Sequence, residues 1–269
     1  MECLSALDIL NQAELFHDVP YEVLKDIQAL GFPVHATQHA PIFHQGDEAT
    51  TLYIVLGGHL RTTQTTPCGH QLILRYLGPG GLAGHAVLSG DQYHPATVVA
   101  VKESHLIGWS RNAIRQIMAC HSVVAMNALN ILGQRYHEMQ QRLTELSTED
   151  AEHRIARTVL RLIRQAGRRT ARGIELAFPL SRQDLAEMTG TTLHTVSRTF
   201  SAWEGRGLVA SGRRKVIVRE PHQLALIASE GTQRLRDVHD LLDPRPLMPG
   251  PKARTAGSCP DASEQTRKK

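Results

Sequence analysis

The chain has 269 residues, of which 41% are apolar and 21% charged, and its formal net charge is +4. This composition excludes a disordered or fibrous chain, and the length suffices for one large or two medium domains. No run of 18 apolar residues predicts a transmembrane helix, the acidic start lacks the basic region of a signal peptide, and four scattered cysteines argue against a disulfide framework. We therefore expect a cytoplasmic protein without a membrane partner.

The charge is divided unevenly along the chain. Residues 1–150 carry 8 basic and 14 acidic residues, net −6, whereas residues 151–240 carry 16 and 9, net +7. An acidic half followed by a basic half predicts two domains with different partners, of which the basic one is the candidate polyanion binder. Because only 4% of the residues are aromatic, a stacking platform for single-stranded nucleic acid is disfavoured.

The first half of the sequence predicts a small helical segment followed by strands. Apolar residues recur near a 3.6-residue period over residues 4–30, which favours helix. From about residue 33, short apolar runs alternate with glycine-rich turns; the runs lie at 52–56, 72–77, 97–101 and 105–109. Strands separated by turns, without helices between them, predict an antiparallel barrel or roll, and we assign residues 1–121 to this domain.

A short helix over 111–119, capped by Ser110, leads to a long helix from about 122 to 146. Residues at alternating steps of three and four form a coiled-coil-like seam: Val123, Met126, Asn130, Gly133, Tyr136, Gln140 and Leu143. The pattern predicts homodimerisation through segment 122–147. The alternative is a helix packed on its own barrel, and the polar residues Asn130 and Gln140 keep that alternative open.

The second half predicts a smaller domain over residues 148–230. A break at 147–150 precedes a basic amphipathic helix with Ile155, Val159, Leu162 and Ile163 on one face. Residues 167–177 predict a loop leading to a short strand, and the segment around 209–218 predicts a hairpin. Residues 243–269 contain five prolines and no apolar period, which predicts a disordered tail.

Residues 181–206, SRQDLAEMTGTTLHTVSRTFSAWEGR, predict a helix-turn-helix. Ser181 caps the first helix with Asp184 three residues on, Gly190 allows the turn, and Thr191 or Thr192 caps the second helix. Val196, Phe200 and Trp203 form the inner face of that second helix, and Ala186 is small where the two helices touch.

The outward face of the second helix suits the major groove of duplex DNA. Small polar residues let a helix N-terminus approach phosphates closely, and an arginine such as Arg198 can bind guanine O6 and N7 together. The candidate DNA-binding residues are Arg182, Thr191, Thr192, His194, Thr195, Ser197, Arg198, Arg213, Arg214 and Lys215, the last three at the tip of a wing. The alternative is a protein-interaction domain with a solvated basic face.

These motifs resemble the CRP/FNR family of bacterial transcription regulators over about residues 10–225. His194-Thr195-Val196-Ser197-Arg198 occupies the place of the family's Glu-Thr-Val-Ser-Arg recognition motif, and segments 41–61 and 69–88 resemble its β-roll. The resemblance implies an α+β chain: a cyclic-nucleotide-binding-like antiparallel β-roll, a long dimerisation helix and a C-terminal winged helix-turn-helix. It also implies a homodimer on a palindromic promoter site and contact with RNA polymerase.

Departures from the family pattern bear on the effector. Cyclic-AMP-binding members have Glu after the glycine of the pocket turn and a later Arg-Ser pair, where this chain has Gly84-His85 and His94-Pro95. The loss of that arginine and of a backbone donor at proline predicts no response to cyclic AMP. Iron–sulfur members need three clustered N-terminal cysteines, whereas only Cys3 lies near the start, so no iron–sulfur cluster is expected.

The string TTLHTVSR resembles the nitric-oxide-responsive NnrR/DNR-type branch, which controls denitrification and anaerobic genes through haem. That resemblance implies haem as the cofactor, with His85 or His94 as candidate iron ligand in the effector pocket. The alternatives are a surface or hydrogen-bonded histidine and a regulator with a different effector or none. A cupin-like metal enzyme is the remaining alternative, but no His-x-His, P-loop or Gly-x-Ser-x-Gly motif supports an enzyme.

Overall fold

The computed structural model describes residues 5–229 and begins with three short helices, α1 (Ala6–Gln12), the 3₁₀ turn η1 (Glu14–Phe16) and α2 (Tyr21–Ala29). Ser5 caps α1: its side chain accepts from the Asp8 backbone N–H, and the Asp8 carboxylate accepts from the Ser5 N–H at 3.0 Å. The predicted helical segment is therefore confirmed, although it is divided rather than continuous.

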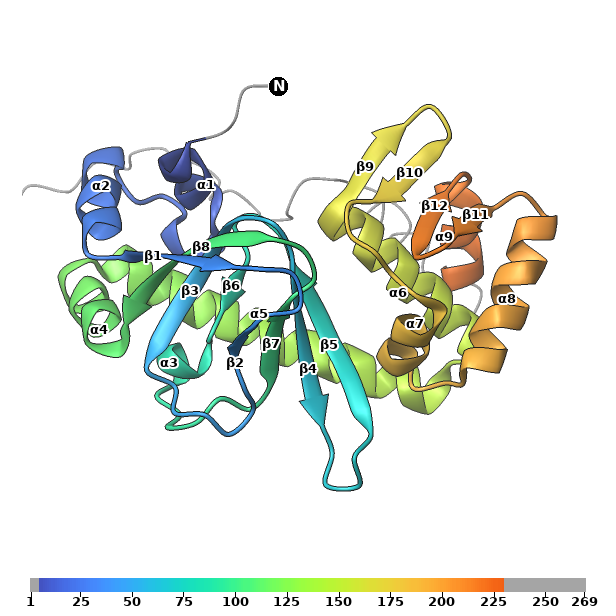
Figure 1. Ribbon diagram of the computed structural model, residues 1–269, viewed down its shortest axis with the longest axis horizontal. Helices are drawn as coiled ribbons and strands as arrows, with labels where there is room; N and C mark the ends of the chain where they lie inside the picture. The colour runs from blue at the N-terminus through green and yellow to red at the C-terminus, as the bar shows by residue number, and fades with distance from the viewer. Residues whose placement is uncertain (1–4, 230–269) are drawn as a thin grey trace, which may run out of the picture.

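Two antiparallel four-stranded sheets form the β-roll, in the orders β1-β8-β3-β6 and β2-β7-β4-β5 (Figure 1). The bounds are β1 (Phe32–Ala36), β2 (Pro41–Phe43), β3 (Thr51–Gly57), β4 (Leu60–Thr65), β5 (Gln71–Leu77), β6 (Leu82–Ala83), β7 (Thr97–Ala100) and β8 (Ser104–Ser110), with helix α3 (Ala86–Ser89) after β6. All four strands predicted from apolar runs are present.

The N-terminal helices pack on the roll around Trp109, which is fully buried. Its indole Nε1 donates to the backbone carbonyl of Ile27 at 2.7 Å, and the edge of the ring meets Phe16 with 5.5 Å between centroids. A buried tryptophan whose N–H is satisfied contributes apolar burial without an unpaired donor. This contact explains why the predicted helices at 4–30 belong to the same domain as the strands.

Helix α4 (Arg111–Cys120) leads into α5 (Ser122–Thr148), which runs from α4 to the start of α6 in Figure 1. The first half of α5 is fixed to its own roll through buried Val124, Ala128 and Ile131. The amide of Asn127 donates to the carbonyls of Leu15 and His17. Within residues 5–229 no single helix could span a membrane; only α4 and α5 taken together pass on length and hydropathy, and they bend by 116°.

The C-terminal domain contains four helices and a small sheet. The helices are α6 (Ala151–Ala166), α7 (Arg182–Thr189), α8 (Leu193–Gly205) and α9 (Pro221–Ser229), and the strands are β9 (Gly167–Thr170), β10 (Gly173–Leu176), β11 (Val209–Gly212) and β12 (Lys215–Val218). The predicted wing hairpin is confirmed as β11–β12. The prediction of a loop at 167–177 is wrong in part, because its first four residues pair with β10 and extend the wing sheet in the order β11-β12-β10-β9.

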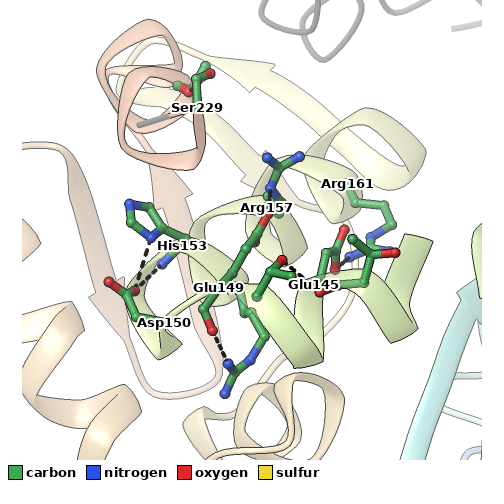
Figure 2. Close-up of polar contacts among 11 residues, drawn as sticks. Glu145, Glu149, Asp150, His153, Arg157, Arg161 and Ser229 are labelled. Carbon is green, nitrogen blue, oxygen red and sulfur yellow. Dashed lines mark hydrogen bonds and ion pairs between the residues drawn. The ribbon is translucent and has the colours of Figure 1, made fainter. Parts of the chain in front are cut away.

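The junction between α5 and α6 is held by ion pairs (Figure 2). Arg161 lies 3.4 Å from Glu145, and Arg157 lies 2.9 Å from Glu149, so two arginines of α6 hold the last turn of α5. Asp150 caps α6 by accepting from the backbone N–H of His153. The predicted break near 147–150 is confirmed, whereas the predicted tail at 243–269 lies outside the described residues.

The winged domain also contacts the β-roll directly. Tyr76 of β5 stacks on Phe178 with 4.1 Å between the ring centroids. Arg61 of β4 lies 3.1 Å from Asp184 of α7, and both side chains are less than one-third exposed. The orientation of the helix-turn-helix therefore depends on contacts with the roll as well as on α5.

Candidate nucleic-acid interface and effector pocket

Local capping positions the helix-turn-helix as predicted. Ser181 and Asp184 form a reciprocal capping box at the start of α7, and Gly190 ends that helix with φ +60, a left-handed conformation that glycine adopts without strain. Of the two predicted caps for α8, the structure selects Thr192, whose hydroxyl accepts from the Thr195 N–H at 3.1 Å. These caps fix the angle at which α8 leaves the turn.

The inner face of α8 is anchored in the domain core. Val196, Phe200 and Trp203 are fully buried, as the sequence predicts. The Trp203 Nε1 donates to the Glu152 carboxylate at 2.8 Å, which ties the recognition helix to α6. Because complete burial of a large aromatic side chain stabilises a fold by roughly 1.5–3 kcal/mol, this anchor keeps the opposite face of α8 turned outward.

The outward face of α8 presents the predicted base-reading residues. His194 and Arg198 are exposed, whereas Thr191, Thr195 and Ser197 are half-buried. The hydroxyls of Thr192 and Thr195 lie 2.9 Å apart at the helix N-terminus. An exposed guanidinium on the outward face of a helix is the arrangement that reads base edges in a major groove.

The wing residues differ in how freely they can reach DNA. Arg213 and Arg214 are exposed at the turn, but Lys215 lies 3.2 Å from Glu175. Arg182 lies 3.6 Å from Glu204 and donates to Ser211 at 3.2 Å, so it also joins α7 to α8 and the wing. The candidate contacts Arg182 and Lys215 would therefore have to share their charge with a neighbouring carboxylate.

Sequence reasoning missed a second basic hairpin beside the wing. Arg168, Arg169 and Arg172 are exposed on β9 and the turn to β10, in the same sheet as the wing. The run GRRTARG, basic and bounded by glycines, carried the signal, because such spacing is compatible with a tight hairpin. The basic surface of the domain is therefore wider than the wing alone.

A cavity of about 380 Å³ lies between the β-roll and α5, toward the small end of the roughly 300–1,000 Å³ range of small-molecule sites. Both predicted pocket histidines line it. Burial lowers the pKa of His85, and the nearby Arg75 and Arg135 lower it further. His94 is buried, its ring is stacked on Phe43 with 3.7 Å between centroids, and its Nδ1 has no hydrogen-bond partner among the described residues.

The same cavity holds three arginines that the sequence analysis did not place there. Arg75 comes from β5, and Arg135 and Arg142 come from α5. The expectation of no response to cyclic AMP, which rested on the arginine lost at His94-Pro95, therefore left out these cations. It compared only the positions where the family has Arg-Ser, whereas these arginines reach the cavity from β5 and α5.

The face of α5 that points away from the roll is apolar and exposed. Among the predicted seam residues, Met126, Tyr136 and Leu143 are 55–67% exposed, Asn130 and Gly133 are also exposed, and Val123 is half-buried. The prediction missed Leu129, Met139 and Leu146, which are 54–62% exposed on the same helix; Met139 lies at the edge of this face and also lines the cavity. We call these six large apolar side chains the α5 stripe: Met126, Leu129, Tyr136, Met139, Leu143 and Leu146.

Comparison with known proteins identifies the two domains. Residues 33–121 match the cyclic nucleotide-binding domain, and residues 153–227 match the Crp-like helix-turn-helix domain. The chain is 35% identical over 223 residues to the "Cyclic AMP receptor protein" of Thermus thermophilus, covering 81% of this chain and 98% of the relative. The chain belongs to the CRP/FNR family of DNA-binding transcription regulators.

More distant relatives carry other names. The "Nitrogen fixation regulation protein FixK" of Azorhizobium caulinodans is 26% identical over 205 residues, covering 76% of this chain and 82% of the relative. The solved structure of FixK2 from Bradyrhizobium japonicum superposes with a TM-score of 0.66 at 22% identity, over 74% of this chain and 98% of that one. This structural likeness supports the α+β fold, as predicted, and does not distinguish between effectors.

Proposed function

We propose that two copies of this regulator bind a palindromic duplex site and that a small molecule in the effector pocket sets their affinity for it. One observation carries the proposal: α5 contributes residues both to the cavity and to the exposed α5 stripe. Arg135 and Arg142 line the cavity, while Tyr136 and Leu143 lie on the α5 stripe. A molecule that favours one position of α5 would change how two copies meet, and hence the spacing of their recognition helices.

A second copy of the chain is the occupant that best fits the α5 stripe. The stripe follows the three- and four-residue steps of a helix-helix seam, and its six large apolar side chains are each more than half exposed. Contiguous exposed apolar surface of this kind marks an interaction site. The first half of α5 also packs on its own roll, as the alternative reading expects, and the exposed stripe on its other face supports the dimer reading.

Within the DNA site, we assign base reading to Arg198 and phosphate contacts to Arg213 and Arg214. Arg198 is the exposed guanidinium on the outward face of α8, and arginine recognises guanine through two parallel hydrogen bonds. His194 replaces the family's glutamate, so the base preference at its position is left to experiment. Contact with RNA polymerase stays a prediction from the resemblance.

The direct test is selection of bound sequences from a random duplex pool by the full-length protein. The expected result is an inverted repeat with half-sites about one helical turn apart, centre to centre. Enrichment of a single half-site, or binding that does not depend on sequence at any salt concentration, would contradict the proposal.

Nitric oxide acting through haem is the second candidate for control, together with the denitrification or anaerobic genes that the NnrR/DNR resemblance implies. One observation favours it, namely the buried, unpartnered Nδ1 of His94. Two observations count against haem: the His94 ring is stacked on Phe43, and the cavity is small and lined by three arginines. The pocket therefore does not fit a haem, and this hypothesis rests on the resemblance; an absorption spectrum of haem-titrated protein, with and without nitric oxide, tests it.

The prediction that cyclic AMP does not change operator affinity also needs a direct test. His94-Pro95 still lacks the family's Arg-Ser pair, but β5 and α5 bring arginines to the cavity. Titration of operator binding with cyclic AMP up to millimolar concentration decides the matter. Unchanged affinity would support the prediction, and a tightening would make cyclic AMP the effector.

Among the described residues, one group has the side chains that a metal enzyme would need. His35, Glu103 and His105 place ligand atoms within 4.8 Å of one another, but all three are exposed, on β1, in the turn before β8 and on β8, and none of them lines the cavity. An exposed cluster does not enclose a substrate, and the relatives of this chain are named as regulators. The arrangement favours regulation over catalysis.

A further inference from the structure

Strands β1 and β8 bring two histidines and a glutamate together on the outer surface of the roll. His35 of β1 lies directly opposite His105 of β8 in the antiparallel ladder, so both side chains leave the same face of the sheet. Glu103 lies two residues before His105, in the turn that leads into β8. Because β1 is the edge strand of the order β1-β8-β3-β6, this group lies at the edge of a sheet (Figure 1).

The three side chains are close enough to share one ion. The His35 Nε2 lies 2.9 Å from a carboxylate oxygen of Glu103, and the centroids of the His35 and His105 rings are 4.9 Å apart. One ligand atom from each residue falls within 4.8 Å of the others. Ligand atoms around a tetrahedral zinc ion stand roughly 3.4 Å apart, since each is about 2.1 Å from the metal. Because all three side chains are exposed, small rotations would close the group on an ion.

A hydrogen bond between His35 and Glu103 accounts for two of the three residues and leaves the His105 ring open. Strand β8 lies between β1 and β3, and both neighbours of His105 in the strand are buried, whereas His105 itself is exposed. On the β3 side its partner in the ladder is Gly57, which has no side chain to cover the ring. Within residues 5–229 the ring meets that of His35, but no hydrogen-bonding group pairs with its nitrogens.

The ligand types determine which ions the group can bind. Two imidazole nitrogens and one carboxylate oxygen are typical ligands of Zn²⁺, and imidazole also suits copper and nickel. Mg²⁺ and Ca²⁺ instead prefer sites made of oxygen ligands. Three protein ligands around a tetrahedral ion leave the fourth position to water.

We propose that His35, Glu103 and His105 bind a divalent transition-metal ion of the zinc class, which joins the edge strand β1 to β8. His35 and Glu103 are 68 positions apart in the sequence, so the ligands meet only in the folded roll. A bound ion therefore stabilises the folded chain relative to the unfolded one. The inference goes beyond the proposed function, because none of the three residues lines the cavity or belongs to α5, α8 or the wing.

Equilibrium titration with Zn²⁺ tests the site in the full-length protein, purified without a histidine tag and stripped of metal. A chromophoric chelator that competes for the ion reports the dissociation constant, and Mg²⁺ is the control ion. We expect at least one Zn²⁺ per chain to bind in competition with the chelator, and excess Mg²⁺ not to displace it. Equally tight binding of Mg²⁺, or no competition with the chelator, would overturn the proposal.

Variants locate the ion. His35→Gln, Glu103→Gln and His105→Gln should each weaken Zn²⁺ binding by about tenfold or more, since losing even the hydrogen-bond partner of a ligand costs about 10- to 100-fold. His70→Gln removes an exposed histidine from the turn between β4 and β5 and should leave the affinity unchanged. Circular dichroism confirms that each variant is folded, and any one folded site variant carries the test. Undiminished affinity in the folded site variants would place the ion elsewhere and overturn the assignment.

Thermal unfolding distinguishes the folded site from ion binding by residues that are neighbours in the sequence. Zn²⁺ should raise the unfolding temperature of the wild type and of His70→Gln, but not that of His105→Gln. A local pair such as His17 and Asp18, 3.1 Å apart, can also hold an ion in the unfolded chain and would give a smaller shift. Zn²⁺ should also slow amide hydrogen exchange in β1. If neither the unfolding temperature nor exchange in β1 responds to bound Zn²⁺, the proposal is wrong.

Discussion

Removing one side chain from the α5 stripe should weaken self-association by a calculable amount. Leu143 is 67% exposed in the single chain, the largest exposed fraction among the stripe residues. Complete burial of a leucine is worth roughly 1.5–3 kcal/mol, so covering two-thirds of it is worth about 1–2 kcal/mol in each protomer. Leu143→Ala, present in both copies, should therefore cost about 2–4 kcal/mol, or about 30- to 700-fold in the dimer dissociation constant.

The measurement is sedimentation equilibrium over a range of concentrations, with operator binding as the functional readout. Leu30→Ala is the matched control, because Leu30 is 55% exposed but lies at the end of α2, away from the stripe. Met126→Asp and Gly133→Asp should have a larger effect, since a charge at the seam would have to be desolvated. A Leu143→Ala protein that dimerises as tightly as the Leu30→Ala control would refute the use of this face, and the seam would then lie elsewhere.

Three further predictions concern DNA and the contact between domains. Arg198→Ala should cost about 1–3 kcal/mol on the selected operator and almost nothing on random duplex, and equal losses on both in a competition assay would reduce Arg198 to a phosphate contact. Replacing Arg213 and Arg214 by Ala should weaken binding to both duplexes and lower the salt slope by about one per lost contact, and an unchanged slope would place the wing away from DNA. Arg61→Ala removes the partly buried partner of Asp184, so it should lower the free energy of unfolding by about 1–2 kcal/mol and speed hydrogen exchange in α7. Lys25→Ala, which removes an exposed ion pair with Glu22, is the control and should change neither quantity.

Local patterns were enough to predict the elements whose signal lies in neighbouring residues. The capping box at Ser181 and Asp184, the turn at Gly190 and the buried face of α8 follow from spacing alone, and all are present. Strands β3, β5, β7 and β8 follow from continuous apolar runs. Strands β1 and β2 were missed because FPVHA and PIF are short and contain proline, which weakens a strand signal even though edge positions tolerate it.

The pocket could not be predicted in the same way, because its cations come together only in the folded chain. Arg75 and Arg135 are 60 positions apart in the sequence and reach one cavity only when β5 lies against α5. The comparison of His94-Pro95 with the family's Arg-Ser pair was locally correct and still incomplete. A single helical line was also too narrow for the exposed apolar face of α5, since Leu129, Met139 and Leu146 extend that face beyond it.

Contacts from the pocket to the recognition helix suggest how occupancy of the pocket would reach DNA. Arg142 faces the cavity, and Glu145, one turn later on α5, pairs with Arg161 of α6 (Figure 2). At the other end of α6, Glu152 accepts from Trp203, the buried anchor of α8. Because α6 is a continuous helix between these two contacts, a rotation at the α5–α6 junction would carry α8 with it. The element that both sites can bias is the junction itself, where Arg157 pairs with Glu149 and Arg161 with Glu145. All four side chains are less than one-fifth exposed, so breaking either pair would leave a buried charge at substantial cost, and the two helices should move together.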